Sequence, residues 1–355
     1  MATERARVVV AMSGGVDSTV AAGLLQQAGH DVMGVTMRLS SFHSGGPDPR
    51  EQTIEDARQA AARLGIPHHV AELTGAFQRQ VLDYFLTEYQ HARTPNPCVR
   101  CNQQIKFGAL LAEARELGGQ FLATGHYVRL VSHGGRYAVA RAVCREKDQS
   151  YVLSGLSQEQ LGHVLFPLGE LTKEETRAFA RSLGFDTVAE KSESQDICFL
   201  AGGDYRSYVA QEGVPGTPGP IISSSGTVLG THTGLANYTI GQRKGLGIAG
   251  PRPYYVLRLL PERNAVVVGF HEETFAARLT TRGVVWMGFP PQREPFECQI
   301  QIRYRHEAVP CTIEPAPGHF SAVFHTPQRA VTPGQWAALY RDDMVLASGA
   351  IDTFE

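Results

Sequence analysis

The strongest constraint on the fold of this chain is an alternation of strand-like and helix-like segments that begins at residue 7. Residues 7–12 (RVVVAM) are apolar and rich in β-branched side chains, as expected for a strand buried on both faces. A glycine-rich turn follows, and apolar positions then recur at helical spacing over 18–28, before a capping glycine at position 29. Further strands are expected at 31–39, 68–73 and 121–127, and helices at 51–64 and 75–92. The pattern predicts a doubly wound, mostly parallel α/β sheet.

The second half of the chain has a different pattern. Residues 213–247 are rich in Gly, Ser, Thr and Pro, which favours a small β-rich central domain. Apolar residues at 296, 298, 300 and 302 alternate with polar ones, which is typical of antiparallel strands with one polar face. We therefore predict three domains, an α/β domain at 1–200, a central domain at 201–275 and a C-terminal antiparallel β-barrel at 276–355.

Composition excludes several classes of protein. The 355 residues are 43% apolar and 19% charged, which is the profile of an ordinary globular protein rather than a disordered one. No stretch of eighteen apolar residues occurs, and residues 1–7 lack the features of a signal peptide, so we expect a cytoplasmic protein with no membrane segment. Because the formal net charge is −2, any contact with nucleic acid must use a locally basic surface.

The turn after the first predicted strand, Ser13-Gly14-Gly15-Val16-Asp17-Ser18, has the features of a phosphate site. Backbone N–H groups and the dipole at the start of a helix attract anions, and the two glycines let the backbone approach closely. Asp17 would repel phosphate unless a magnesium ion lay between them, so we expect Mg²⁺ and ATP. The alternative is an ordinary glycine turn in which Asp and Ser cap a helix.

Cysteines mark a second candidate site. Cys98 and Cys101 form a CxxC pair in the polar segment 94–107, which we expect to be a loop over the sheet, and the neighbouring Arg100 and Lys106 should favour thiolate over thiol. Cys198 lies far along the chain in SQDICFL (194–200). The CxxC pair could instead be half of a zinc site, and Cys198 could simply be buried.

The remaining cysteines carry no expected chemistry. Cys298 and Cys311 lie among apolar residues and are expected in the core, and no role is assigned to Cys144. Six cysteines in a long chain do not suggest a disulfide framework.

The glycine-rich turn resembles the SGGxDS loop of the N-type ATP pyrophosphatases, which cleave ATP to AMP and pyrophosphate and transfer AMP to a carbonyl oxygen. Taken together, several segments resemble the tRNA-specific 2-thiouridylases. They are AMSGGVDS (11–18), TPNPCVRCNQQIKF (94–107), ATGHY (123–127), KDQSY (147–151), ICF (197–199) and GQRKGLGI (241–248), with weaker agreement in RYR (303–305) and PGQ (333–335).

The resemblance implies roles for individual residues. Asp17 would act in catalysis, Cys101 would be the nucleophile and Cys198 would carry persulfide. ATP would be held by Ala11, Met12, Ser13, Gly14, Gly15, Val16, Asp17, Ser18, Met37 and Gly125. Contacts to tRNA would come from Asn96, Pro97, Cys98, His126, Lys147, Asp148, Gln149, Arg303, Tyr304 and Gln335. Alternatively, His126 is a satisfied histidine at a strand end, and each basic residue belongs to a solvated surface.

The implied reaction replaces the 2-oxygen of the wobble uridine in the tRNAs for lysine, glutamate and glutamine with sulfur. ATP would adenylate that oxygen, and Cys198 would present persulfide sulfur supplied by a cysteine desulfurase or a relay protein. That sulfur would attack directly, or Cys101 would attack Cys198 and release hydrosulfide, leaving a disulfide between them. Rival interpretations are an ATP pyrophosphatase with another acceptor, and a nucleotide- or zinc-binding regulatory module without catalysis.

Cys98 departs from the better-known family pattern, which has aspartate at this position, so an acid-base role there is in doubt. Cys98, Cys101 and Cys198 could instead hold an iron-sulfur cluster with one iron open to hydrosulfide. Cys98 could also shield Cys101 in a CxxC disulfide, or be a silent substitution.

Overall fold

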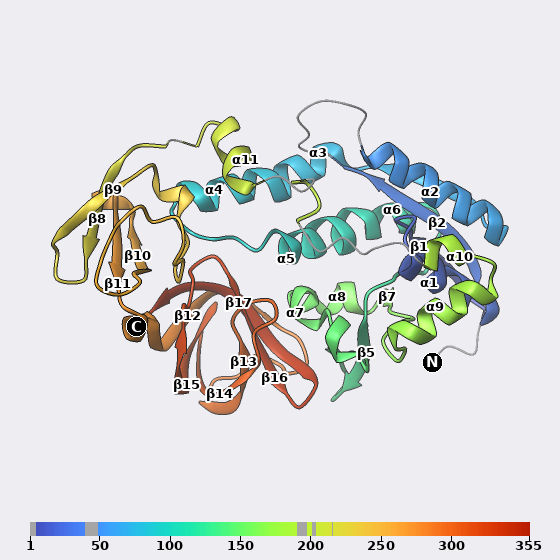
Figure 1. Ribbon diagram of the computed structural model, residues 1–355. Helices are drawn as coiled ribbons and strands as arrows, with labels where there is room; N and C mark the ends of the chain where they lie inside the picture. Colours follow the sequence, from blue (N-terminus) through green and yellow to red (C-terminus); the bar gives the residue numbers. More distant parts are fainter. Residues whose placement is uncertain (1–4, 40–48, 190–196, 201–203, 215) are drawn as a thin grey trace.

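Figure 1 shows a computed structural model of the chain, in which residues 5–39, 49–189, 197–200, 204–214 and 216–355 are described. The first four residues, which entered the signal-peptide argument, and residues 194–196 of the SQDICFL segment lie outside the described residues. The α/β half, a small sheet and a barrel occupy separate parts of the molecule (Figure 1). The boundaries predicted for the three domains at 200 and 275 remain predictions, and residues 201–203 at the first of them are also outside the described residues.

The first half forms the predicted parallel sheet. Its strands are β1 (Arg7–Ala11), β2 (Asp31–Arg38), β3 (His68–Glu72), β4 (Phe121–Thr124) and β7 (Val164–Leu165). They lie in the order β3-β2-β1-β4-β7, and every neighbouring pair is parallel. The strand order reverses direction at β1, whose last residue is in register with the last residue of β4. Ligands bind at such a reversal point, outside the carboxyl ends of the strands.

Helices cover both faces of this sheet. Alternate side chains of β1 point to opposite faces, so each face has apolar side chains that are buried under helices. Val8 and Val10 are buried against α1 (Val16–Gln27), α2 (Pro49–Leu64) and α9 (Lys173–Ser182), which is followed by α10 (Asp186–Ala189). Val9 is buried with the long helical segment on the other face. That segment consists of α3 (Thr74–Phe77), η1 (Gln78–Leu82), α4 (Asp83–Gln90), α5 (Pro97–Cys101), η2 (Asn102–Ala109) and α6 (Leu110–Glu116).

The segment 94–107, expected to be a loop, is helical from Pro97 onward, so that prediction was wrong. Proline is compatible with the first turn of a helix, and the Asn96 side chain caps it by accepting a hydrogen bond from the Val99 N–H at 3.2 Å. Val99, Ile105 and Phe107 are fully buried, so the segment also contributes to the core. The expected strand at 121–127 ends earlier than predicted, at Thr124.

Short elements connect the sheet to the rest of the chain. They are the hairpin β5 (Val128–His133) and β6 (Arg136–Arg141), η3 (Arg145–Lys147), α7 (Ser150–Leu153), α8 (Gln158–Leu161) and α11 (Tyr205–Gln211). The central sheet has the order β10-β11-β8-β9. Its elements are β8 (Gly219–Ser223), β9 (Val228–His232), η4 (Leu235–Asn237), β10 (Tyr255–Leu260), η5 (Pro261–Arg263), β11 (Ala265–Gly269) and the following η6 (His271–Thr274).

The C-terminal part is the predicted antiparallel barrel. Its strands are β12 (Phe275–Trp286), β13 (Phe296–Gln301), β14 (Val309–Ala316), β15 (His319–Arg329), β16 (Trp336–Arg341) and β17 (Met344–Phe354). The barrel closes because β12 pairs with both β15 and β17. Strand β6 joins the edge of β17 through the pair of Ala140 and Met344, so the first half of the chain extends the barrel sheet. Cys298 and Cys311 face each other across β13 and β14, with their sulfurs 3.8 Å apart.

Candidate active site

The glycine-rich turn lies at the carboxyl end of β1 and leads into α1. Gly14 has φ +67°, and a Cβ atom there would lie 2.5 Å from the Cβ of Asp56, so both the turn and the packing require glycine. The Ser13 N–H donates to the Ser18 hydroxyl at 3.1 Å, which fixes the turn from within. Within the part of the chain that the structure describes, the N-terminal cap of α1 has no side-chain hydrogen bond. The start of this helix can therefore receive an anion.

Asp17 is bound by two groups from distant parts of the chain. Its Oδ1 accepts hydrogen bonds from the Lys173 ammonium at 2.7 Å and from the Tyr127 hydroxyl at 2.9 Å. The Lys173 side chain is 5% exposed and the Asp17 side chain 30% exposed. Lys173 therefore supplies a positive charge that we had expected only from magnesium. It was missed because the sequence contains no local signal linking it to a residue 156 positions away.

The other residues predicted to hold ATP gather around this turn. A Cβ atom at Gly125 would lie 2.7 Å from the Asp17 carbonyl carbon and the Ser18 nitrogen, so the chain after β4 packs directly on the start of α1. Met12 and Val16 are buried, and Met37 lies half-buried near the end of β2. The structure thus brings the predicted nucleotide residues together at the end of β1, β2 and β4 where the strand order reverses.

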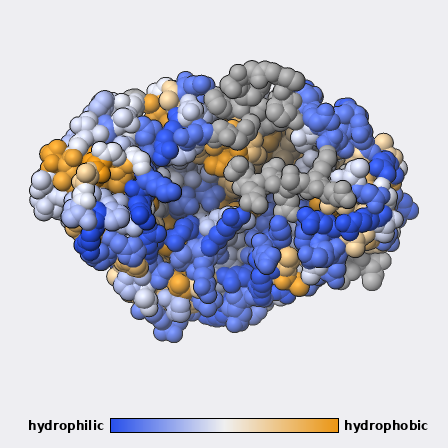
Figure 2. Space-filling model, viewed as in Figure 1, coloured by the Kyte–Doolittle hydropathy of each residue, from blue (hydrophilic) through white to orange (hydrophobic). Residues whose placement is uncertain are grey.

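A cavity of about 420 Å³ lies beside this region. It is lined by Phe77, Val81, Pro95, Asn96, Pro97, Cys98, Cys101, Asn102, Lys106, His126, Gln149, Val152, Ile197, Cys198, Phe199, Tyr304 and Gln335. Nine of these were singled out in the sequence, as catalytic residues or tRNA contacts. Lys147, Asp148 and Arg303 do not line it. The face of the molecule drawn in Figure 2 is hollowed near its middle, and both hydrophilic and hydrophobic side chains are visible at the edge of the hollow.

The three cysteines of the cavity differ in their surroundings. Cys98 and Cys198 are exposed, whereas Cys101 is buried. Although the Cys98 side chain reaches the surface, the protein packed around its sulfur raises the pKa of the thiol; nearby Cys198 also raises it, and Lys106 only partly opposes this. The expected shift towards thiolate was therefore wrong for Cys98.

Arg100 contributes little to that balance because its guanidinium group points elsewhere. It donates to the backbone carbonyl and the side chain of Gln80, at 3.1 Å each, and lies over the ring of Tyr84. Among the described residues, no three His, Cys, Asp or Glu side chains are arranged to hold a metal ion.

His126 follows β4 and is a satisfied, buried histidine. Its Nδ1 is 2.7 Å from the Thr124 hydroxyl, and its Nε2 is 3.3 Å from the Lys106 ammonium. Burial lowers the pKa of His126 well below its usual value, and the Lys106 charge lowers it further. A neutral ring with Nδ1–H donating to Thr124 and Nε2 accepting from Lys106 satisfies both contacts. Its predicted contact with tRNA remains a prediction.

Several other predicted tRNA contacts make hydrogen bonds within the protein. Asp148 accepts hydrogen bonds from the Ala142 N–H and the Ser150 hydroxyl, at 2.9 and 2.6 Å. Gln149 accepts from the Tyr127 N–H at 3.0 Å. Arg303 donates to the backbone carbonyl of Arg329 at 3.1 Å, and Lys147 and Gln335 are half-buried. Tyr304 is 44% exposed and remains available to a ligand.

A turn of the barrel holds the segment that leads to the CxxC pair. Gln335 donates to the carbonyls of Thr94 and Pro95 at 2.9 and 3.2 Å, and the Thr94 N–H donates to the Pro333 carbonyl at 2.9 Å. Gly334 has φ +91°, and a Cβ atom there would lie 2.8 Å from the Thr94 carbonyl oxygen. The C-terminal barrel therefore positions the start of α5.

The parallel sheet and its glycine-rich turn place the chain among α/β proteins that bind nucleotides at the end of a parallel sheet. Family models match three regions: a "tRNA methyl transferase HUP domain" at 6–202, a "tRNA methyl transferase PRC-barrel domain" at 207–270 and an "aminomethyltransferase beta-barrel domain" at 276–351. The chain belongs to the family of the tRNA-specific 2-thiouridylases.

Two relatives illustrate the extent of the similarity. The chain is 47% identical to "tRNA-specific 2-thiouridylase MnmA" of Trichlorobacter lovleyi, over 97% of each chain. It is 42% identical to the protein of the same name from Pelotomaculum thermopropionicum, over 99% of this chain and 98% of that one. A solved structure, "U34-tRNA thiolase NcsA from Methanococcus maripaludis with its [4Fe-4S] cluster", is 19% identical with a TM-score of 0.37, covering 59% of this chain and 66% of that one. Within the described residues, no helix is both long and apolar enough to span a membrane.

Proposed function

We propose that the protein is a sulfurtransferase that uses ATP to convert the wobble uridine of the lysine, glutamate and glutamine tRNAs to 2-thiouridine. The observation that carries the proposal is the cavity of about 420 Å³, in which Cys98 and Cys101 meet Cys198 from a segment about a hundred residues away. Cavities of this size hold small ligands, and amide or thiol groups from several elements converge in it. The names and extent of the relatives support the same activity.

We assign the ATP-dependent activation of the base to the nucleotide turn and the transfer of sulfur to the cavity. The 2-oxygen of uracil attacks the α-phosphate of ATP, pyrophosphate leaves, and the resulting adenylate makes AMP the leaving group at C2. Gly125 links the two sites because it packs on the turn, while the next residue, His126, lines the cavity. Magnesium would reduce the phosphate charge, and the partly exposed Asp17 carboxylate is the group at the turn that would face it. Target bases are unstacked for such chemistry at a cost of a few kcal/mol.

Cys198 carries the sulfur as a persulfide delivered by a cysteine desulfurase or a relay protein. In one route its terminal sulfur attacks C2 and expels AMP, and the Cys101 thiolate then attacks the Cys198 sulfur, which breaks the sulfur-sulfur bond and leaves the sulfur on C2. In the other, the Cys101 thiolate attacks the Cys198 sulfur, the sulfur-sulfur bond of the persulfide breaks and hydrosulfide is released to attack C2, expelling AMP. The cysteines are then joined by a disulfide, which a thiol reductant returns to two thiols with two electrons. The exposure of Cys198 suits delivery by another protein, and burial of Cys101 protects the nucleophile from solvent.

The competing route uses an iron-sulfur cluster held by Cys98, Cys101 and Cys198. We place the persulfide route ahead of it because the protein brings the three thiols into one cavity without needing a metal. A brown protein with about four irons per chain after anaerobic purification, losing both iron and activity as Cys98→Ala, would instead establish the cluster.

Substitution of Cys198 tests whether adenylation and sulfur transfer depend on different residues. Cys198→Ser should still release AMP and pyrophosphate and form adenylated tRNA, because activation needs the turn and ATP only, but should yield no 2-thiouridine by mass spectrometry of nucleosides. Cys144→Ser is the matched control, since Cys144 is half-buried and does not line the cavity. Thiolation by Cys198→Ser would remove this residue from the mechanism. Failure of tRNA to stimulate AMP release by the unaltered protein would favour a regulatory module.

A further inference from the structure

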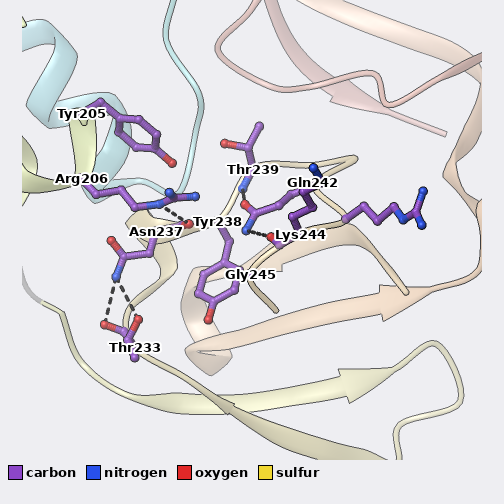
Figure 3. A pocket seen from close by; sticks show the side chains of 10 residues that line it. Tyr205, Arg206, Thr233, Asn237, Tyr238, Thr239, Gln242, Lys244 and Gly245 are labelled. Atoms are coloured by element: carbon purple, nitrogen blue, oxygen red, sulfur yellow. Dashed lines mark hydrogen bonds between the residues drawn. The ribbon is translucent and has the colours of Figure 1, made fainter. Parts of the chain in front are cut away.

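A second hollow, of about 850 Å³, lies between α11 and the loop that follows η4 (Figure 3). Its lining residues are Tyr205, Arg206, Thr233, Asn237, Tyr238, Thr239, Gln242, Arg243, Lys244 and Gly245. Part of the lining is the GQRKGLGI segment, which the reaction described above does not use. Three of the lining side chains are cationic and none is acidic.

The loop that carries two of these cations is held firmly. The Gln242 side chain accepts from the Thr239 N–H at 3.1 Å and donates to the Lys244 carbonyl at 3.0 Å, and both contacts are drawn in Figure 3. Gly241 and Gly245 have φ of +83° and +75°, which glycine adopts without strain. Leu246 is buried in the central core. The backbone is therefore fixed from both sides of Arg243 and Lys244.

Arg243 and Lys244 themselves point their charge to solvent. Both are exposed, and among the described residues the Arg243 guanidinium and the Lys244 ammonium make no hydrogen bond or ion pair. Arg206 is different: its Nε donates to the Asn237 carbonyl at 3.1 Å, and it pairs with Asp204 at 3.4 Å. Two unpaired cations on a rigid loop form a surface that is prepared for an anionic partner.

The hollow is a neighbour of the cysteine cavity. Thr239 lines the hollow, and its hydroxyl is 3.5 Å from the hydroxyl of Thr94. Thr94 is followed by Pro95 and Asn96, which line the cavity. A polymer with one unit in the cavity can thus extend across these two threonines into the hollow. Because RNA carries one phosphate for each nucleotide, its backbone would meet the cations of the loop.

We infer that this hollow binds the phosphodiester backbone of the RNA substrate next to the modified nucleotide, with Arg243 and Lys244 as the phosphate contacts. The inference rests on the proposed function, since it takes the occupant of the cysteine cavity to be a base of that RNA. Proximity to the cavity favours RNA over an acidic surface of a sulfur-donor protein. Such a contact positions the substrate without reading its sequence.

The test is the salt dependence of tRNA binding by Arg243→Gln/Lys244→Gln. Each lost phosphate contact lowers the slope of log affinity against log salt by about 0.7 for single-stranded RNA. The double variant should therefore have a slope smaller by about 1.4, and its affinity should fall on the order of 25-fold at 0.1 M salt. Arg181→Gln/Arg293→Gln is the matched control, because both arginines are exposed and line neither site. It should keep the slope of the unaltered protein.

Three results would overturn the inference. They are a slope equal to that of the control, a loss of affinity without a change of slope, and normal RNA binding with impaired sulfur transfer from a donor protein, which would assign the hollow to that partner. Formation of 2-thiouridine by the unaltered protein is measured in parallel. If it occurs while the slope is unchanged in the double variant, the hollow is misassigned and the proposed function stands.

Discussion

Replacing Lys173 by methionine removes the charge that the structure places on Asp17 while keeping most of the apolar stem. The two groups are 2.7 Å apart, and the Lys173 side chain is 5% exposed. Breaking a fully buried ion pair by removing one partner costs about 3–5 kcal/mol. The Asp17 side chain is 30% exposed and keeps its hydrogen bond from Tyr127, so screening reduces this. We expect a loss of about 2 kcal/mol of unfolding free energy.

The same change should slow adenylation. An uncompensated carboxylate beside the phosphates of ATP opposes the transition state by a similar amount, and about 2 kcal/mol corresponds to roughly 30-fold in rate. The assay is AMP release at saturating tRNA, with unfolding followed in denaturant. Asp17→Asn/Lys173→Met closes a double-mutant cycle, and the structure predicts a coupling of at least about 1 kcal/mol in stability. Additive losses of stability, or unchanged AMP release by Lys173→Met, would refute the reasoning.

Further expectations concern individual residues. Asp17→Asn should abolish AMP release but leave tRNA affinity in a binding assay nearly intact; normal AMP release with weakened binding would contradict this. Gly125→Ala should displace the turn and weaken ATP binding by calorimetry, since its Cβ would lie 2.7 Å from the Ser18 nitrogen; unchanged ATP affinity would count against it. Burial lowers the pKa of His126, so its stabilising contribution is present above about pH 6.5 and lost as the pH falls below that value. As the pH falls from about 7 to about 5, the free energy of unfolding measured in urea should therefore decrease less for His126→Gln than for the unaltered protein. Equal decreases would exclude this contribution of His126. The unaltered protein and Cys98→Ala should both be colourless and thiolate tRNA from a persulfide donor, whereas a brown unaltered protein that loses colour and activity as Cys98→Ala would favour the cluster.

Local patterns explain which parts of the fold could be predicted. The strand, turn and helix over residues 7–28 are specified by neighbouring residues, and the structure has them at Arg7–Ala11 and Val16–Gln27. The helix after Pro97 was missed because the segment 94–107 is polar and contains two prolines, which indicates a loop, and because its fully buried residues Val99, Ile105 and Phe107 are irregularly spaced. Residues Asn102–Ala109 form a π-helix, whose wider turn changes that spacing.

The candidate site shows the same limit. Sequence resemblance indicated the cysteines and the turn, and the structure places them at adjacent sites. The partners of these residues come from elsewhere in the chain, as Lys173 does for Asp17 and the barrel turn does for Thr94. Contacts of this kind depend on the folded arrangement, and no spacing rule reports them.

The turn around Gly334 has a consequence for synthesis of the protein. The chain leaves the ribosome from its N-terminus, so the cysteine helix emerges more than two hundred residues before the turn that fixes its start. A nascent or prematurely terminated chain would have the glycine-rich turn and Cys101 but not the hydrogen bonds from Gln335 to Thr94 and Pro95. Incomplete products would therefore lack an assembled sulfur-transfer site, so thiolation would have to wait until the C-terminal barrel has been synthesised and folded.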